Sequence, residues 1–264
     1  MNIFIRELRA YRKSLIIWSV ALFFTIVSSM AKYTSYVGSG ESLNQIMSSV
    51  PKTIRAVLGM GNFDLTKASG FYGMLYLYIL LMATIHASLL GANIISKEER
   101  DKTTEFLMVK PVSRSKIITA KLLAAFFNII VFNIVTLALS IAIVTKYANG
   151  EQIIGDIVIL MIGMFILQMV FLSIGTGIAA LSRNSKAAPT SATVVLLVSF
   201  VLSSAISMNS RLEGLKYITP FKYFEAENVL NGGIQPVFVI LSSVIIVVMI
   251  YITYVFYRKR DLNV

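Results

Sequence analysis

Few side chains in this sequence could carry out covalent chemistry. The 264 residues include no cysteine and a single histidine, His86. A serine beside a histidine can act as a nucleophile, and Ser39, which stands between two glycines, is the serine that suggests this role. Ser39 is expected outside the membrane and His86 in the middle of a long apolar stretch, so hydrogen-bond contact between them is not expected. The pattern therefore disfavours an intramembrane hydrolase, and we expect no catalytic residue.

The sequence also lacks the usual loop for binding nucleotide phosphates. The pattern Gly-x-x-x-x-Gly-Lys-Ser/Thr is absent, so the chain is not expected to bind and hydrolyse ATP by that route. We expect no cofactor and no metal ion in this chain.

Two polar residues within apolar stretches are candidates for a transport path, His86 and Gln168. Ionisable groups inside a membrane are functional candidates by default, so His86 could carry a proton or contact a substrate. The alternative is a neutral imidazole hydrogen-bonded to a neighbouring helix. Gln168 could likewise supply a hydrogen bond between helices, a role also expected of Asn93, Asn128 and Asn133.

Charged residues gather in one segment, Ser96–Lys116. Ten of the 37 charged side chains fall within these 21 residues. Residues 98–109 are good helix formers, Pro111 ends that element, and Ser113 or Ser115 can cap a following helix. A short helix rooted between two spans can transmit a push, whereas an ordinary solvated loop cannot. We expect this segment to be the contact with another protein.

The elements that must position these residues are membrane spans. The sequence is 56% hydrophobic and 14% charged, whereas soluble domains have about 25% charged residues. About 20 apolar residues cross the hydrocarbon core of a bilayer. We predict an all-α polytopic membrane protein with one domain, residues 1–264, and six transmembrane helices at about 15–31, 71–95, 117–145, 153–181, 188–208 and 237–257.

The distribution of lysine and arginine predicts the orientation. With a cytoplasmic N-terminus, 16 of the 24 Lys and Arg residues lie on the inner side and eight on the outer side, in agreement with the positive-inside rule. With acidic residues included, the inner side carries +10 and the outer side +1. We therefore expect a multi-pass protein of the cell (plasma) membrane with both termini and Ser96–Lys116 in the cytoplasm. Orientation, rather than binding of nucleic acid, explains the net charge of +11.

The first span also resembles a cleavable signal peptide, because basic residues precede it and Ser29-Met30-Ala31 follows. Its apolar run is longer than that of a usual signal peptide, and cleavage would remove one span and upset the charge distribution. We expect no cleavage.

Three segments outside the spans are expected to lie along the membrane surfaces. Residues 3–15 have one apolar and one cationic face, which is typical of an amphipathic elbow helix at the inner surface, or else of a simple extension of the first span. In the first outer loop, residues 43–58 have a second apolar stripe, in which Pro51 marks a kink or a new helix start. Residues 209–235 include several aromatic residues together with proline and glycine, a composition that favours a short re-entrant hairpin before the sixth span.

These features resemble the membrane-spanning subunits of type-2 ABC exporters, the ABC-2 permeases, over essentially the whole chain. The most specific match is an acidic run followed by Thr-x-Glu-x-Leu, Pro-Val-Ser-Arg and Lys-Leu, formed here by Lys97, Glu98, Glu99, Thr103, Thr104, Glu105, Phe106, Leu107, Met108, Lys110, Pro111, Val112, Ser113, Arg114, Lys121 and Leu122. Weaker matches are Leu172–Gly175, Ser182–Ala188 and Tyr217–Phe221. The family often has glycine at a turn just before the threonine, where this chain has Lys102.

The resemblance implies a cytoplasmic coupling helix that contacts a separate ABC ATPase subunit. The expected contact residues are Lys97, Glu98, Glu99, Thr103, Thr104, Glu105, Phe106, Leu107, Lys110, Pro111 and Arg114. Two ATPase copies would bind ATP and Mg²⁺ and move two permeases, either two copies of this chain or this chain and a paralogue, between inward- and outward-facing states. The chain itself would be a non-enzymatic permease of an exporter, in contact with membrane lipid. Its mostly apolar walls favour an amphipathic cargo such as an antimicrobial peptide, a drug or a lipid-like molecule.

The alternative is an ion-coupled secondary carrier or channel without an ATPase partner. Charged residues in the middle of the spans or an inverted internal repeat would favour it, and the sequence shows neither in a convincing form.

Overall fold

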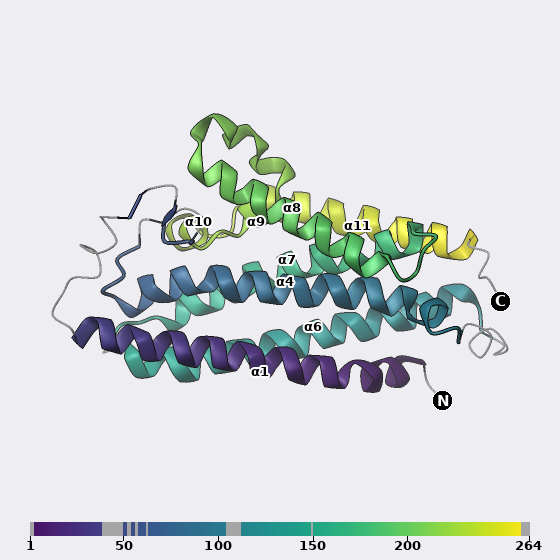
Figure 1. Cartoon of the computed structure of the whole chain (residues 1–264), viewed down its shortest axis with the longest axis horizontal. Coiled ribbons are helices and arrows are strands. Elements are labelled where there is room, and N and C mark those ends of the chain that lie inside the picture. The colour runs from purple at the N-terminus through teal and green to yellow at the C-terminus, as the bar shows by residue number, and fades with distance from the viewer. Residues whose placement is uncertain are drawn as a thin grey trace.

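Six long helices form one bundle in the computed structural model of the chain (Figure 1). The structure describes residues 3–38, 50–51, 54–55, 58–61, 63–103, 112–148 and 150–259. Each predicted span falls on one long helix, and all six are long and apolar enough to cross a membrane. Their bounds are Ile3–Gly38 (α1), Ala68–Arg100 (α4), Arg114–Val144 (α6), Ile154–Leu181 (α7), Ala188–Met208 (α8) and Pro236–Lys259 (α11). The described residues contain no strand, and the predicted all-α fold with six spans is confirmed.

The N-terminal segment is helical but does not form a separate elbow helix. Residues 3–15 continue into the first span within the single helix α1, because no glycine or proline interrupts the sequence before Gly38. Its apolar residues Phe4, Leu8 and Tyr11 pack against buried residues at one end of the bundle. This apolar face is therefore covered by neighbouring helices, which differs from the predicted element in the plane of the membrane.

Helices α4 and α7 form the centre of the bundle. Most of their length is buried, whereas only a small part of α1, α8 and α11 is buried, and the most extensive contact between described helices is that of α4 with α7. Figure 1 shows α1 and α6 on one side of this central pair and α8 and α11 on the other. The exposed apolar faces of the outer helices suit contact with lipid.

Two glycines allow α4 and α7 to approach closely. A Cβ atom on Gly91 of α4 would lie 2.2 Å from the backbone oxygen of Leu172, and one on Gly175 of α7 would lie 2.5 Å from that of Ser88. Since real Cβ atoms do not come this close to backbone oxygen, only glycine fits at either position. Small residues at such crossings are typical of helix packing in membranes. Gly175 and Gly91 therefore provide close packing between α4 and α7.

The two ends of the bundle differ in their connections. The start of α1 and the end of α11 lie at the same end of the bundle as the end of α4 and the start of α6 (Figure 1). A 3₁₀ turn, η1 (Thr145–Tyr147), lies in the short connection between α6 and α7 at the opposite end. That opposite end also carries three short helices between α8 and α11, namely η2 (Ser210–Ile218), α9 (Pro220–Tyr223) and α10 (Ala226–Gly232).

The short helices follow the proline and glycine pattern of residues 209–235. Pro220 stands at the start of α9, where its missing N–H has no helical partner to lose, and Gly233 follows α10 with a φ of +69°. The aromatic side chains of Phe221, Tyr223 and Phe224 are buried in the main core. The aromatic residues thus anchor this segment to the long helices.

The amphipathic stripe predicted for residues 43–58 lies largely outside the described residues. The carbonyl oxygen of Pro51 accepts hydrogen bonds from the N–H groups of Ile54 at 3.0 Å and Arg55 at 3.1 Å. These bonds agree with a helix start at Pro51, whose carbonyl oxygen accepts the first helical hydrogen bonds.

Candidate functional site

The charged segment begins at a cluster of ion pairs that joins three helices. Glu98, in the last turn of α4, accepts hydrogen bonds from Lys121 of α6 and, at 2.9 Å, from Arg6 of α1. Lys121 Nζ also donates to the backbone oxygen of Ile94 at 2.6 Å, and Arg6 donates to Glu7. We refer to Arg6, Glu7, Glu98 and Lys121 as the ion cluster.

The ion cluster is shielded from solvent. The Lys121 side chain has 0% exposure, Glu7 2% and Glu98 8%, and only Arg6, at 29%, reaches the surface. Two cations and two carboxylates balance one another, as buried charges require. Removing any one partner would leave a buried charge uncompensated, so the cluster holds the end of α4 against α1 and α6.

The pairing of Glu98 with Lys121 was not predicted from the sequence. Glu98 faces the bundle, although the resemblance had suggested it as a contact for another protein. A signal was available, because Lys121 lies within the predicted third span and a lysine there needs a partner. Which carboxylate supplies that partner depends on how the helices are rotated against each other.

Beyond Glu98 the chain leaves α4 in a sharp turn at Lys102, whose φ is +55°. The N–H of Lys102 donates to the Glu99 oxygen at 3.2 Å and that of Thr103 to the Glu98 oxygen at 2.8 Å. This is the Schellman arrangement, which usually places glycine in the left-handed position. The turn is therefore present although lysine occupies that position. Of the residues 98–109 that favour a helix, Glu98–Arg100 form the end of α4, 101–103 form the turn, and 104–109 lie outside the described residues.

Other residues at the two ends of the charged segment are also held by packed helices. Lys97 Nζ lies 5.5 Å from the ring centre of Tyr11 in α1. At the far end, Ser113, one of the two serines expected to cap α6, accepts the N–H of Lys116 at 3.4 Å. Arg114 donates to the backbone oxygen of Arg258 at 3.0 Å. The remaining predicted contacts lie outside the described residues: Thr104, Glu105, Phe106, Leu107, Lys110 and Pro111.

His86 is surrounded by aromatic rings. It stacks on Phe132 of α6 with ring centres 4.8 Å apart and lies 5.8 Å from the Trp18 ring of α1. Among the described residues neither ring nitrogen has a hydrogen-bond partner, so the hydrogen bond to a neighbouring helix that we expected for a neutral imidazole is not present. The side chain contributes to packing between α1, α4 and α6.

Gln168 forms the hydrogen bonds between helices that were proposed for it. Its Nε2 donates to the backbone oxygen of Ala83 in α4 at 3.2 Å, and its Oε1 accepts from Asn133 of α6. Asn93, in contrast, donates within α4 to Leu89, so the expectation of an interhelical bond from Asn93 is wrong. Gln168 therefore links α7 to both α4 and α6 at the centre of the bundle.

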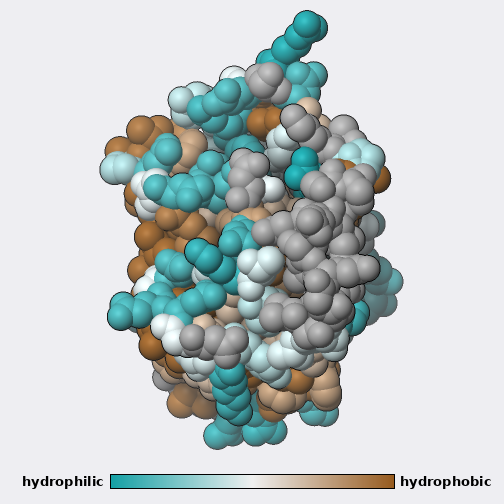
Figure 2. Space-filling model, turned by 90° about the vertical axis from the view of Figure 1, so that its left-hand side faces the viewer, coloured by the Kyte–Doolittle hydropathy of each residue, from teal (hydrophilic) through white to brown (hydrophobic). Residues whose placement is uncertain are grey.

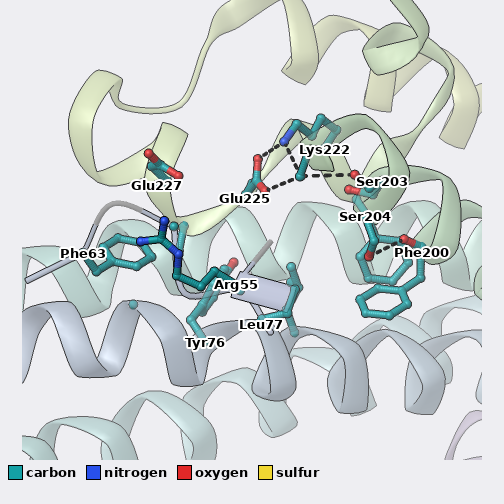
Figure 3. A pocket seen from close by; sticks show the side chains of 17 residues that line it. Arg55, Phe63, Tyr76, Leu77, Phe200, Ser203, Ser204, Lys222, Glu225 and Glu227 are labelled. Carbon is teal, nitrogen blue, oxygen red and sulfur yellow. Dashed lines mark hydrogen bonds and ion pairs between the residues drawn. The ribbon is translucent and has the colours of Figure 1, made fainter. Parts of the chain in front are cut away.

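A cavity of about 320 Å³, lined by both charged and apolar side chains, lies at the end of the bundle opposite the charged segment. Figure 3 shows several of its side chains, which come from the first part of α4, the last part of α8, helices α9 and α10, and the segment before α4. We call it the outer pocket, because this end of the bundle is the outer end in the orientation expected from the sequence. It is lined by Arg55, Gly59, Gly61, Phe63, Gly73, Tyr76, Leu77, Leu80, Phe200, Ser203, Ser204, Ser207, Phe221, Lys222, Glu225, Ala226 and Glu227.

The charged groups of the outer pocket are unequally satisfied. Lys222 Nζ donates to Glu225 and, at 2.8 Å, to Ser207 Oγ, whereas Arg55 Nε is buried and has no hydrogen-bond partner among the described residues. Beside the pocket, burial raises the pKa of the Tyr223 phenol. Sequence reasoning did not find this site, because its residues come from segments that lie far apart in the chain.

These features define the chain as a multi-pass membrane protein built from one helical bundle, with the ion cluster at one end and the outer pocket at the other. A family model described as ABC-2 family transporter protein matches residues 1–262, and the chain belongs to this family. Permeases of this family are membrane subunits without a nucleotide-binding domain of their own, and they generally work with an ABC ATPase partner. A comparison with curated proteins finds no match.

Proposed function

We propose that this chain is the permease subunit of an ATP-driven exporter of amphipathic molecules and that Ser96–Lys116 is the docking segment for its ATPase. Membership of the ABC-2 family supports an ATPase partner, and the sequence has no phosphate-binding loop of its own. On this proposal ATP and Mg²⁺ bind to the ATPase, and the permease supplies the path.

The ion cluster is the observation that carries this proposal. Glu98 stands at the entrance to the docking segment and is tied to α6 through Lys121 and to α1 through Arg6. A displacement of the segment would thus act on three spans together, because the buried charges cannot separate without a large free-energy cost. At the other end of the segment, Arg114 contacts the end of α11.

The charge distribution supports a cytoplasmic position for the docking segment. The positive-inside rule places it, with both termini, on the inner side, and α1 begins and α11 ends at the bundle end that carries the segment. We further propose two permeases and two ATPases in the complex. The exposed apolar faces of α1, α8 and α11 offer surface for a second permease as well as for lipid.

Reconstitution with a candidate ATPase tests the docking segment. The candidate is a P-loop protein encoded next to this chain, and the measurements are co-purification and ATP turnover in lipid vesicles. The double substitution Glu105→Ala and Arg114→Ala is expected to weaken the complex and to reduce ATP turnover at least about tenfold, since each removed charge contributes about 1 kcal/mol or more at a buried contact. The matched control is Glu213→Ala with Arg211→Ala, which removes the same charges at the opposite end of the bundle.

If Ser96–Lys116 receives the ATPase, the first variant loses complex formation and ATP turnover whereas the control variant keeps both. Unchanged complex formation and turnover in the first variant would show that the docking segment does not receive the ATPase. An equal loss in both would point to a general defect of the protein.

A further inference from the structure

The outer pocket contains a half-buried arginine, Arg55, whose Nε atom is buried. Arg55 Nε has no partner among the described residues, whereas the second cation of the pocket, Lys222, donates to both Glu225 and Ser207. A buried donor without a partner costs about 1–3 kcal/mol, and a charged one costs more. An anionic group with two oxygen atoms, such as phosphate, is the partner that an arginine fork fits best.

The pocket also carries two carboxylates, so a simple anion does not match its charge. Glu225 and Glu227 line it together with Arg55 and Lys222, and the four formal charges balance. The Glu227 carboxylate lies against Gly61, since a Cβ on that glycine would be only 2.7 Å from Glu227 Oε2. A group with separated positive and negative charges is the better complement to a neutral pocket of this kind.

The walls change from polar to apolar along the bundle. Ser207 and Gly73 lie near the outer ends of α8 and α4, whereas Phe200 and Leu80 line the pocket seven residues deeper on each helix. Seven helical residues span about 10 Å. The charged groups come from the connections beyond the helix ends, so the polar part faces outward and the apolar part points toward the middle of the bundle (Figure 3).

The end of the bundle that carries the pocket has the same polarity as a membrane surface. Figure 2 shows hydrophilic side chains gathered on this end, with hydrophobic ones on its flanks. A ligand in the pocket would thus have its head level with the membrane surface and its tail directed into the apolar layer.

We propose that the outer pocket binds a phospholipid with a zwitterionic head, the phosphate on Arg55 and the ammonium beside Glu225 and Glu227. Leu80, Phe200 and Phe221 receive the first part of the acyl chains. The inference rests on the pocket alone and does not require an ATPase, so it stands or falls independently of the docking segment.

Binding to the purified, delipidated full-length chain in detergent tests this assignment. The probe is dioctanoyl phosphatidylethanolamine, with the dissociation constant measured by native mass spectrometry. Three further ligands separate the parts of the probe: dioctanoyl phosphatidylglycerol lacks the ammonium, dioctanoylglycerol lacks the head, and phosphoethanolamine lacks the tails. We expect phosphatidylethanolamine to bind at least about tenfold more tightly than each of them, since each omits one charge-assisted or apolar contact.

Substitutions identify the site of binding. Arg55→Gln is expected to raise the dissociation constant for phosphatidylethanolamine at least about tenfold, and Arg55→Lys, which keeps the charge but not the fork, to give an intermediate value. The matched control is Arg211→Gln, an exposed arginine at the same end of the bundle that does not line the pocket. Circular dichroism checks that each variant is folded.

Two results would overturn the assignment. One is equal affinity of wild type and a folded Arg55→Gln variant for phosphatidylethanolamine. The other is equal binding of dioctanoylglycerol and phosphatidylethanolamine, which would show that the head is not recognised.

Discussion

Replacing Lys121 by methionine tests the ion cluster. Methionine fills a similar volume but removes the cation from a fully buried position, so the variant loses the bonds to Glu98 and to the Ile94 oxygen. Breaking a buried ion pair costs about 3–5 kcal/mol. Because Arg6 still lies 2.9 Å from the Glu98 carboxylate, we expect the lower end of this range, about 3 kcal/mol of unfolding free energy.

A double-mutant cycle separates the loss of the pair from the loss of a side chain. In the double variant Lys121→Met with Glu98→Gln, no unpaired carboxylate remains. We therefore expect its free energy of unfolding to fall by only about 1 kcal/mol, the contribution of one hydrogen bond. The double variant should thus be more stable than Lys121→Met alone. Lys116→Met, an exposed lysine on the same helix, is the control and should change stability by less than about 0.5 kcal/mol.

The assay is reversible unfolding of the purified chain in mixed micelles with increasing fractions of sodium dodecyl sulfate, followed by far-ultraviolet circular dichroism. The cycle gives the coupling energy between Lys121 and Glu98. A coupling energy below about 0.5 kcal/mol, which is within the additivity of independent sites, would refute the reasoning that these two groups stabilise each other.

The same assay checks three further substitutions. Gly175→Ala should destabilise the chain by about 2 kcal/mol, because the new methyl group meets a backbone oxygen of α4. Its control is Gly155→Ala in the same helix, which has open space around the new methyl group and should be neutral or slightly stabilising. Equal effects of the two substitutions would contradict the close crossing of α4 and α7. Tyr72→Phe should cost about 1 kcal/mol through loss of its 2.8 Å hydrogen bond to Ser140, and a cost that persists unchanged in a Ser140→Ala background would rule that bond out. His86→Phe should stay within about 1.5 kcal/mol of wild type, since its ring contacts can be kept; a larger loss would show that an imidazole nitrogen is needed.

Local properties of the sequence determined the spans and several of their ends. Whether a stretch can cross a bilayer depends on its own length and apolarity, so the six spans were identified before any tertiary contact was known. The cap of α6 could be narrowed to Ser113 or Ser115 for the same reason, since a cap depends on neighbouring backbone groups. The resemblance of the charged segment likewise agreed with the family found for the whole chain.

Only the tertiary structure decided which residues meet. Glu98 could have faced a partner protein or another helix, and the rotation of α4 against α1 and α6 places it on Lys121. The outer pocket brings residues between 55 and 80 together with residues between 200 and 227, and Arg55 becomes a candidate ligand only because its buried Nε has no partner among the described residues. The physical reason is that transfer into a membrane is set by the composition of each stretch alone, whereas pairing of polar groups is set by helix crossing and rotation, to which residues of every helix contribute.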